Sequence, residues 1–200
     1  MTDRQPGPAA VVLAAGASTR MGRPKLALPV GGVPMLRRVA EAAAASRCGE
    51  VVVVLGGAHA AAYRPLLDGL PVRVVENPDP GEGMGSSIRV GVAAISPEAT
   101  GVVILLADQP LVTAAIIDQL VETAVAGGHR IVASAYRGVV GPPAYFDRAL
   151  FLELLTLEGD RGARSVIERY PQQGVALPLP EEAAVDVDVP EDLPATGAEP

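Results

Sequence analysis

Short apolar runs alternate along this chain with segments of helical spacing, and this alternation limits the folds available to it. The runs rich in Val, Ile and Leu predict strands at Ala9–Ala14, Val51–Leu55, Val72–Val75, Val102–Leu106 and Ile131–Ala135. The segments with helical spacing are Met35–Arg47, Ala58–Leu67, Met84–Ile95 and Thr113–Ala126. Strands that are apolar throughout need cover on both faces. We therefore predict an α/β fold with a mainly parallel sheet between two layers of helices, whose ligand site lies beyond the carboxyl ends of the strands.

The 200 residues fit one domain with a core of its own. Aromatic residues make up 3 % of the chain, so the core is expected to be aliphatic. Past Val140 this alternation changes. We expect two helices, Arg148–Leu157 and Arg161–Tyr170, followed by strand-like segments near Val175 and Val185. We predict a flexible N-terminus over 1–8, a single domain over 9–193 and a disordered tail over 194–200.

Charge and composition exclude several classes of partner. The net charge of −7 argues against a nucleic-acid-binding face, which needs clustered Lys and Arg. No apolar run reaches the length of a membrane span and the N-terminus has no apolar signal region, so we expect a cytoplasmic protein with no membrane partner. The single cysteine, Cys48, cannot form an internal disulfide, and the two histidines lack the spacing of a zinc site.

The stretch "LAAGASTRMGRPK", Leu13 to Lys25, follows the first predicted strand. Its small residues allow backbone N–H groups to approach an anion closely, and Arg20 and Lys25 add positive charge. Lys25 is the one lysine among sixteen Lys and Arg residues, and a compact ammonium fits between oxygens where a guanidinium does not. The spacing matches neither a P-loop nor GxGxxG. From the residues alone, an anion-binding loop and a glycine-rich surface turn with solvated cations both remain open.

Five blocks, in order, carry a resemblance to a known family. They are "LAAGASTRMGRPK", "NPDPGEGMGSSIRVG" (Asn77 to Gly91), "LLADQP" (Leu105 to Pro110), "GDRGAR" (Gly159 to Arg164) and "DVDVPEDL" (Asp186 to Leu193). Together they resemble the MobA-like nucleotidyltransferases, and among these the molybdenum cofactor cytidylyltransferase (MocA-like) group. The resemblance covers essentially residues 9 to 193. It implies a Rossmann-like three-layer sandwich with a mainly parallel, mixed sheet, similar to that of the nucleotide-diphospho-sugar transferases.

The resemblance implies transfer of a nucleotidyl group from a nucleoside triphosphate to an acceptor phosphate, with Mg²⁺. Such an acceptor is already anionic, so catalysis depends on positioning and charge neutralisation rather than on a base. The family pattern assigns Arg20 and Lys25 to the triphosphate. It assigns the nucleotide pocket to a further set of residues: Leu13, Ala14, Ala15, Gly16, Asn77, Ser86 and Ser87. By their position in the first turn of a helix, the two serines are equally explained as helix caps.

Two carboxylates are the expected metal ligands of the site, and one of them, Asp108, is predicted to be catalytic together with Arg20 and Lys25. Asp108 ends an apolar strand, where a carboxylate is costly without a cation or hydrogen bonds. Helix capping is the alternative, but Thr113 lies closer to the next helix and is the better cap. Asp186 and Asp188 alternate with valines, and the resemblance makes Asp188 the second Mg²⁺ ligand. The other interpretation of that acidic segment is a solvated edge strand. The family commonly has Thr at the place of Val189.

The acceptor side is the least determined part of the site. Arg161 and Arg164 of "GDRGAR" lie three apart on an expected helix, and either bind the acceptor phosphate or form an ordinary basic helix start. "VVGPPAYF" has Pro142 where the cytidylyltransferase pattern "GHP" has histidine, so the role of Gly141 to Pro143 is open.

The resemblance implies a Mg²⁺-dependent enzyme that transfers CMP from CTP to molybdenum-bound molybdopterin, with a molybdenum hydroxylase as a potential client. Ala15 resembles the cytidylyl group at a place where the guanylyl group has Gly, and this favours CTP over GTP. The alternatives are a guanylyltransferase, a transferase for another phosphorylated acceptor, and a non-catalytic cofactor carrier. A full set of charge-neutralising residues favours catalysis. The oligomeric state is not determined by the sequence.

Overall fold

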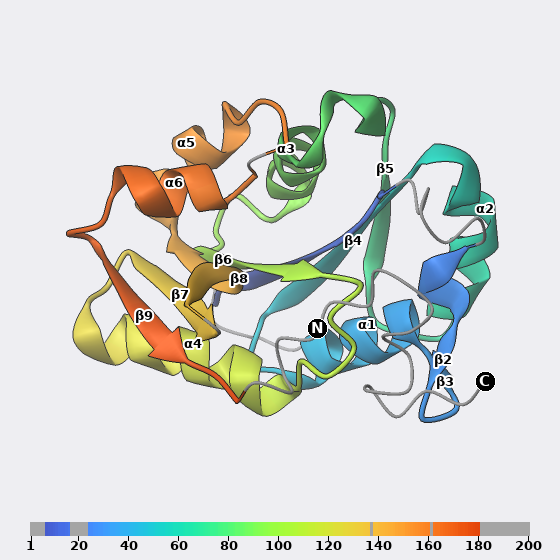
Figure 1. Ribbon diagram of the computed structural model, residues 1–200, viewed down its shortest axis with the longest axis horizontal. Coiled ribbons are helices and arrows are strands. Elements are labelled where there is room, and N and C mark those ends of the chain that lie inside the picture. Colours follow the sequence, from blue (N-terminus) through green and yellow to red (C-terminus); the bar gives the residue numbers. More distant parts are fainter. Residues whose placement is uncertain (1–6, 17–23, 137, 161, 181–200) are drawn as a thin grey trace.

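A seven-stranded sheet forms the centre of the molecule (Figure 1). The computed structural model describes residues 7–16, 24–136, 138–160 and 162–180. The strand order is β5-β4-β1-β6-β8-β7-β9. β8 is antiparallel to both neighbours and every other pair is parallel. The strands are β1 (Ala9–Ala14), β4 (Glu50–Gly56), β5 (Arg73–Asn77), β6 (Gly101–Leu106), β7 (Ile131–Tyr136), β8 (Val139–Asp147) and β9 (Gly174–Pro178).

Helices cover both faces of this sheet. In Figure 1, α1 and α4 lie on one face, and α3, α5 and α6 lie on the other. Their bounds are α1 (Met35–Ala45), α3 (Met84–Ala94), α4 (Ala114–Gly127), α5 (Phe151–Leu155) and α6 (Arg164–Arg169). The remaining elements are short: β2 (Pro29–Val30), β3 (Val33–Pro34), α2 (Ala60–Tyr63) and the 3-10 turns η2 (Lys25–Ala27), η3 (Gly57–His59), η4 (Arg64–Leu67), η5 (Pro80–Glu82) and η6 (Arg148–Leu150). None of the described helices is long and apolar enough to cross a membrane.

Two aliphatic cores lie on the two sides of the sheet. Successive residues of β1 point to opposite faces, so Val12 packs with the core beneath α1 and α4 while Val11 packs with the core beneath α3. Both valines have no exposed surface. Gly91 brings α3 close to the sheet, because a Cβ there would lie 2.4 Å from Cγ1 of Val11. This close packing fixes the distance of α3 from β1.

The predicted mainly parallel, helix-covered sheet is confirmed, and its five predicted strands are present. Three details differ. The segment Ala58–Leu67 is not one helix but two 3-10 turns around the four-residue α2, with Pro65 near the start of the second turn. The two late helices are shorter than predicted, and the sequence pattern missed β8. Thr113 caps α4, with its side chain accepting from Ile116 N at 3.4 Å. The predicted strand near Val185 and the tail lie outside the described residues.

Candidate nucleotide-binding site

A cavity of about 440 Å³ opens at the carboxyl edge of the parallel strands. Its lining joins five parts of the chain: the end of β1, the turn at Lys25, the segment from η5 into α3, the end of β6 and the turn at Asp160. The lining residues are Leu13, Ala14, Ala15, Gly16, Lys25, Leu26, Pro80, Gly83, Met84, Ser87, Leu106, Asp108 and Asp160. The cavity therefore contains most of the described residues that the sequence predicted for the nucleotide site.

Lys25 and Asp108 form an ion pair on the cavity wall. The distance from Nζ of Lys25 to Oδ2 of Asp108 is 2.8 Å, and their side chains are 12 % and 25 % exposed. β1 and β6 are adjacent parallel strands, so the loops that follow them meet at one edge of the sheet. A cation and a carboxylate are thereby fixed side by side, largely out of solvent, where each interacts more strongly with charge than it would in bulk water.

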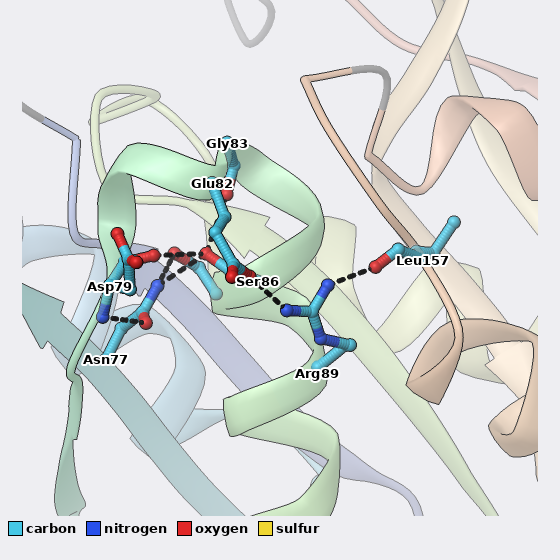
Figure 2. Close-up of polar contacts among 8 residues, drawn as sticks. Asn77, Asp79, Glu82, Gly83, Ser86, Arg89 and Leu157 are labelled. Carbon is cyan, nitrogen blue, oxygen red and sulfur yellow. Dashed lines mark hydrogen bonds and ion pairs between the residues drawn. The ribbon is translucent and has the colours of Figure 1, made fainter.

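Asn77 fixes the turn before α3 rather than facing the cavity. Its side chain is buried, and Nδ2 donates to Oγ of Ser86 at 2.7 Å (Figure 2). The same Nδ2 donates to Oγ of Ser87 at 3.0 Å. Its Oδ1 accepts from Asp79 N at 3.0 Å. The Ser86 hydroxyl lies 2.8 Å from the carbonyl oxygen of Gly83, an interaction within the same turn. These contacts assign Asn77 and Ser86 a positioning role, and the ribose contact predicted for Asn77 stays a prediction.

Ser87 is the serine of this pair that lines the cavity. Its Oγ accepts from Asn77, and no described residue accepts its hydroxyl proton. A hydroxyl in the first turn of α3 can thus donate a hydrogen bond to a ligand in the cavity. The helix-cap alternative does not fit Ser86, because its hydroxyl donates to the carbonyl oxygen of Gly83 and no described side chain caps the start of α3.

Ala15 packs against the end of β4. A Cβ placed on Gly56 would lie 2.9 Å from the Ala15 Cβ and 3.2 Å from the carbonyl oxygen of Asn77. Ala15 is 4 % exposed, so its methyl group is confined between neighbouring backbone segments. The width of the cavity at this point is set by packing that a ligand cannot readily displace.

The Gly141–Pro143 segment lies beside the loop that carries Asp108. Gln109 is fully buried, and its Nε2 donates to the Pro142 carbonyl at 3.4 Å. The Tyr136 hydroxyl donates to the same oxygen at 3.2 Å. Oε1 of Gln109 has no hydrogen-bond partner among the described residues. The structure therefore joins the Gly141–Pro143 segment to the loop that follows β6.

Of four further predicted site residues, the structure describes one, Arg164, which is not among the lining residues of this cavity. Arg20, Arg161 and Asp188 lie outside the described residues. Arg164 is half exposed and pairs with Glu168 on its own helix, at 3.6 Å. That contact fits a basic helix start, and binding of an acceptor phosphate by Arg164 stays a prediction.

Several lining residues were not predicted from the sequence, among them Gly83, Met84 and Asp160. Asp160 belongs to "GDRGAR", of which only the two arginines were predicted to bind a ligand. The available signal was the pair of glycines Gly159 and Gly162, which flank Asp160 and both have positive φ. A turn bounded in this way holds an intervening side chain against a neighbouring segment, here the start of α3.

The donor set at Asp108 suits a hard divalent cation. One carboxylate oxygen is bound to Lys25, and no described residue donates a hydrogen bond to the other. Mg²⁺ and Mn²⁺ commonly bind through one or two carboxylates together with phosphate and water. The described residues contain no group of three or more metal-ligating side chains. The residues present therefore fit a metal that is shared with a phosphate ligand.

Comparison with known families decides the class of this site. A family model described as a MobA-like NTP transferase domain matches residues 10–175. The chain belongs to this family. Its fold is the Rossmann-like fold of nucleotidyltransferases, as the sequence resemblance implied.

Relatives of this MobA-like chain have names from several areas of metabolism. It is 34 % identical to the purine catabolism protein PucB of Bacillus subtilis, over 94 % of this chain and 95 % of that protein. It is 36 % identical to nicotine blue oxidoreductase of Paenarthrobacter nicotinovorans, over 80 % and 81 %. It is 28 % identical to molybdenum cofactor guanylyltransferase of Rhizobium meliloti, over 93 % and 88 %. The names of these relatives do not agree on one reaction, so the family assignment rests on the shared domain.

Solved structures of the family superpose along nearly the whole chain. Rv0371c of Mycobacterium tuberculosis has a TM-score of 0.77 and 33 % identity, covering 95 % of this chain and 97 % of its own. A second structure of that protein is a complex with manganese, with a TM-score of 0.73 and 32 % identity over 94 % and 96 %. A divalent metal in a relative agrees with the donor set at Asp108.

Proposed function

We propose that this MobA-like transferase is a Mg²⁺-dependent enzyme that transfers CMP from CTP to the phosphate of molybdenum-bound molybdopterin and releases pyrophosphate. The observation that carries the proposal is the Lys25–Asp108 pair on the wall of a cavity at the carboxyl edge of the sheet, in a chain of the MobA-like NTP transferase family. A cation and a metal-binding carboxylate side by side are what a triphosphate substrate requires.

The chemistry needs no general base from the protein. An acceptor phosphate oxygen attacks the α-phosphorus, the bond from that phosphorus to the bridging oxygen breaks, and pyrophosphate leaves with that oxygen. Lys25 would bind phosphate oxygens and stabilise the charge that develops on them. Ser87 and the small residues that follow β1 would hold the nucleoside part. Arg20 would add a second cation on the triphosphate, as in the family pattern.

Asp108 would hold the metal, with Asp188 as the proposed second ligand. A bound divalent cation supplies neutralisation of phosphate charge. Mg²⁺ is our choice because it prefers oxygen ligands and phosphates and is the usual metal in phosphoryl-transfer sites. The manganese complex of the M. tuberculosis relative supports a divalent ion, and the particular ion is part of the proposal.

CTP is the proposed nucleotide because of Ala15. A methyl group at this place narrows the cavity, and a purine needs more room than a pyrimidine. The packing of Ala15 against Gly56 supports this argument, because the methyl group has no space to move aside. Steric exclusion by a confined group can discriminate between two ligands by more than the few kcal/mol that a missing methylene group provides. A guanylyltransferase is the alternative within the family.

Molybdopterin is proposed as acceptor because the five sequence blocks resemble the cytidylyltransferase group, and because a relative is named as a molybdenum cofactor guanylyltransferase. Arg161 and Arg164 are the proposed contacts for its phosphate. The product would pass to a molybdenum hydroxylase client in the cytoplasm.

The test measures pyrophosphate release by purified protein with molybdenum-loaded molybdopterin and Mg²⁺. We expect release with CTP to be at least about tenfold faster than with GTP, which is about 1.4 kcal/mol of discrimination. A preference for GTP would assign the chain to the guanylyl branch. Turnover only with another phosphorylated acceptor would keep the chemistry and reject the pathway. Nucleotide binding without any pyrophosphate release would favour a carrier.

A further inference from the structure

Asp160 lines the nucleotide cavity without a polar partner among the described residues. Its side chain is exposed, and no hydrogen bond or ion pair joins its carboxylate to another described residue. The exposed carboxylates of Glu76, Glu82 and Glu122 are each paired with an arginine. Within the described part of the chain the charge of Asp160 therefore holds no other segment in place, and the carboxylate is available to a ligand.

The loop that carries Asp160 is nevertheless fixed to the start of α3. Gly85 N donates to the carbonyl oxygen of Gly159 at 2.9 Å. The Arg89 guanidinium donates to the carbonyl oxygen of Leu157 and pairs with Glu82 (Figure 2). Two connections in the residues just before Asp160 hold this loop against one helix, so the position of the carboxylate is set by the fold.

Gly83 makes room for this carboxylate. Its φ of +94° lies in the region that favours glycine, and a Cβ there would lie 2.5 Å from Oδ1 of Asp160. Asp160 consequently lies against the backbone at the start of α3, on the cavity wall that Ser87 also lines. Gly162 also packs closely on α3, because a Cβ on Gly162 would lie 2.6 Å from Sδ of Met84. The far side of the turn is thus also held on α3.

The charge of Asp160 restricts what it can bind. A triphosphate carries several negative charges, which a carboxylate repels and which the ammonium of Lys25 attracts. A carboxylate accepts hydrogen bonds and donates none, so its suitable partners are N–H and O–H groups. In CTP these groups are the amino group of the base and the hydroxyls of the ribose.

We infer that Asp160 accepts a hydrogen bond from the nucleoside part of the substrate, whereas Lys25 attracts its phosphate part. This inference rests on the proposed function, since it requires a nucleoside triphosphate in the cavity. One cavity would then recognise the two ends of the nucleotide with residues of opposite charge. The family blocks assigned no role to Asp160.

The experiment is calorimetric titration of the intact protein with CTP and Mg²⁺. We expect Asp160→Asn and Asp160→Ala to weaken CTP binding by at least about fivefold, because a hydrogen bond to a charged group is lost. Glu158→Gln is the matched control. It removes the same charge two residues away, and Glu158 lines a neighbouring hollow with Arg89 rather than this cavity. Binding by the control should stay within about twofold of wild type.

Further titrations separate the two sources of the hydrogen bond. If the base amino group is the donor, Asp160→Asn removes the preference of the wild type for CTP over UTP. If a ribose hydroxyl is the donor, the variant instead removes the preference for CTP over 2′-deoxy-CTP. Inorganic triphosphate should bind the variant at least as well as wild type, because a repulsive charge is gone.

Two results would overturn the inference. One is wild-type affinity of both Asp160 variants for CTP, and the other is an equal loss of affinity for CTP and for inorganic triphosphate. Wild-type protein that binds no nucleotide at all would overturn the proposed function and this inference with it. If wild type binds CTP and both Asp160 variants bind it equally well, the inference is overturned and the proposed function is not.

Discussion

Lys25 and Asp108 form a 2.8 Å ion pair although 83 residues separate them in the chain. The pair joins a loop after β1 to the end of the adjacent strand β6. The two charges compensate each other in this structure. If Lys25 binds the triphosphate and Asp108 binds the metal, as proposed, binding of the nucleotide with its metal exchanges this ion pair for new charge contacts, and the exchange can be measured.

Replacement of Lys25 should impair turnover far more than stability. Loss of one preorganised electrostatic donor costs on the order of 100- to 1000-fold in rate, so Lys25→Ala should lose most activity. Lys25→Arg should lose at least about tenfold, or roughly 1.4 kcal/mol, because the guanidinium is broader than the ammonium. Steady-state pyrophosphate release and thermal unfolding measure the two effects. Turnover by Lys25→Arg at the wild-type rate would contradict the compact-ammonium argument.

Lys25→Ala should also bind a divalent ion more tightly when no nucleotide is present. The ammonium competes with a metal for Oδ2 of Asp108, and a partly exposed ion pair contributes up to about 1 kcal/mol, or roughly fivefold in affinity. Electron paramagnetic resonance of free Mn²⁺ measures this affinity directly. A lower affinity for Mn²⁺ in Lys25→Ala would show that the lysine does not mask the carboxylate.

The carboxylates Asp108 and Asp188 should be needed for metal-dependent turnover. Asp108→Asn and Asp188→Asn each remove one charge from a hard-cation site, so each should raise the Mg²⁺ concentration needed for half-maximal rate. EDTA should stop the reaction, and excess Mg²⁺ should restore it. Equal turnover with EDTA, or full activity in both variants, would reject the metal assignment.

Ala15→Gly should reduce the preference for CTP over GTP. Removal of a confined methyl group is worth on the order of 1–3 kcal/mol of discrimination, so the ratio of kcat/KM values should fall by about tenfold or more. The ratio for CTP over UTP is the internal control and should not change, because both bases are pyrimidines. An unchanged CTP to GTP ratio would show that another residue sets the base.

Gly91→Ala should destabilise the fold by about 1–3 kcal/mol through overpacking against β1. Its Cβ would lie 2.4 Å from Val11 and 3.0 Å from Val54, in a fully buried contact. Gly141→Ala is the control, since a Cβ there meets no described atom within 4 Å. Urea unfolding of both variants measures the difference. Equal stability of the two would show that α3 can move away from the sheet at little cost.

Cys48 should make stability fall at alkaline pH. Burial raises the pKa of its thiol from 9.0 to about 11, with Ser46 acting in the opposite direction. Between these values the unfolded chain releases the proton and the folded chain keeps it, so the free energy of unfolding decreases as pH rises. The total effect is about 2 to 3 kcal/mol. Cys48→Ala should flatten the curve between pH 9 and 11 in urea titrations, and an equally steep curve would reject this explanation.

Some features of the molecule were accessible from the sequence because they depend on local pattern. The apolar strand β1, the Thr113 cap and the fold class follow from hydropathy, helix-end chemistry and the alternation of elements. The candidates Lys25 and Asp108 were accessible for the same reason, since each stands at the end of a recognisable block. The break in Ala58–Leu67 was missed because the helical spacing outweighed Pro65.

Tertiary structure alone decided which of these residues meet. The sequence placed Asn77, Ser86 and Ser87 together in one block, but only packing turned Asn77 and Ser86 inward and left Ser87 on the cavity wall. Likewise, the carboxylate of Asp160 reaches the start of α3 because Gly83 has no side chain, a contact between segments 77 residues apart. Sequence pattern reports the local preference of each segment. The partners of a side chain depend on which distant backbone it packs against, and that is decided when the sheet and its helices assemble.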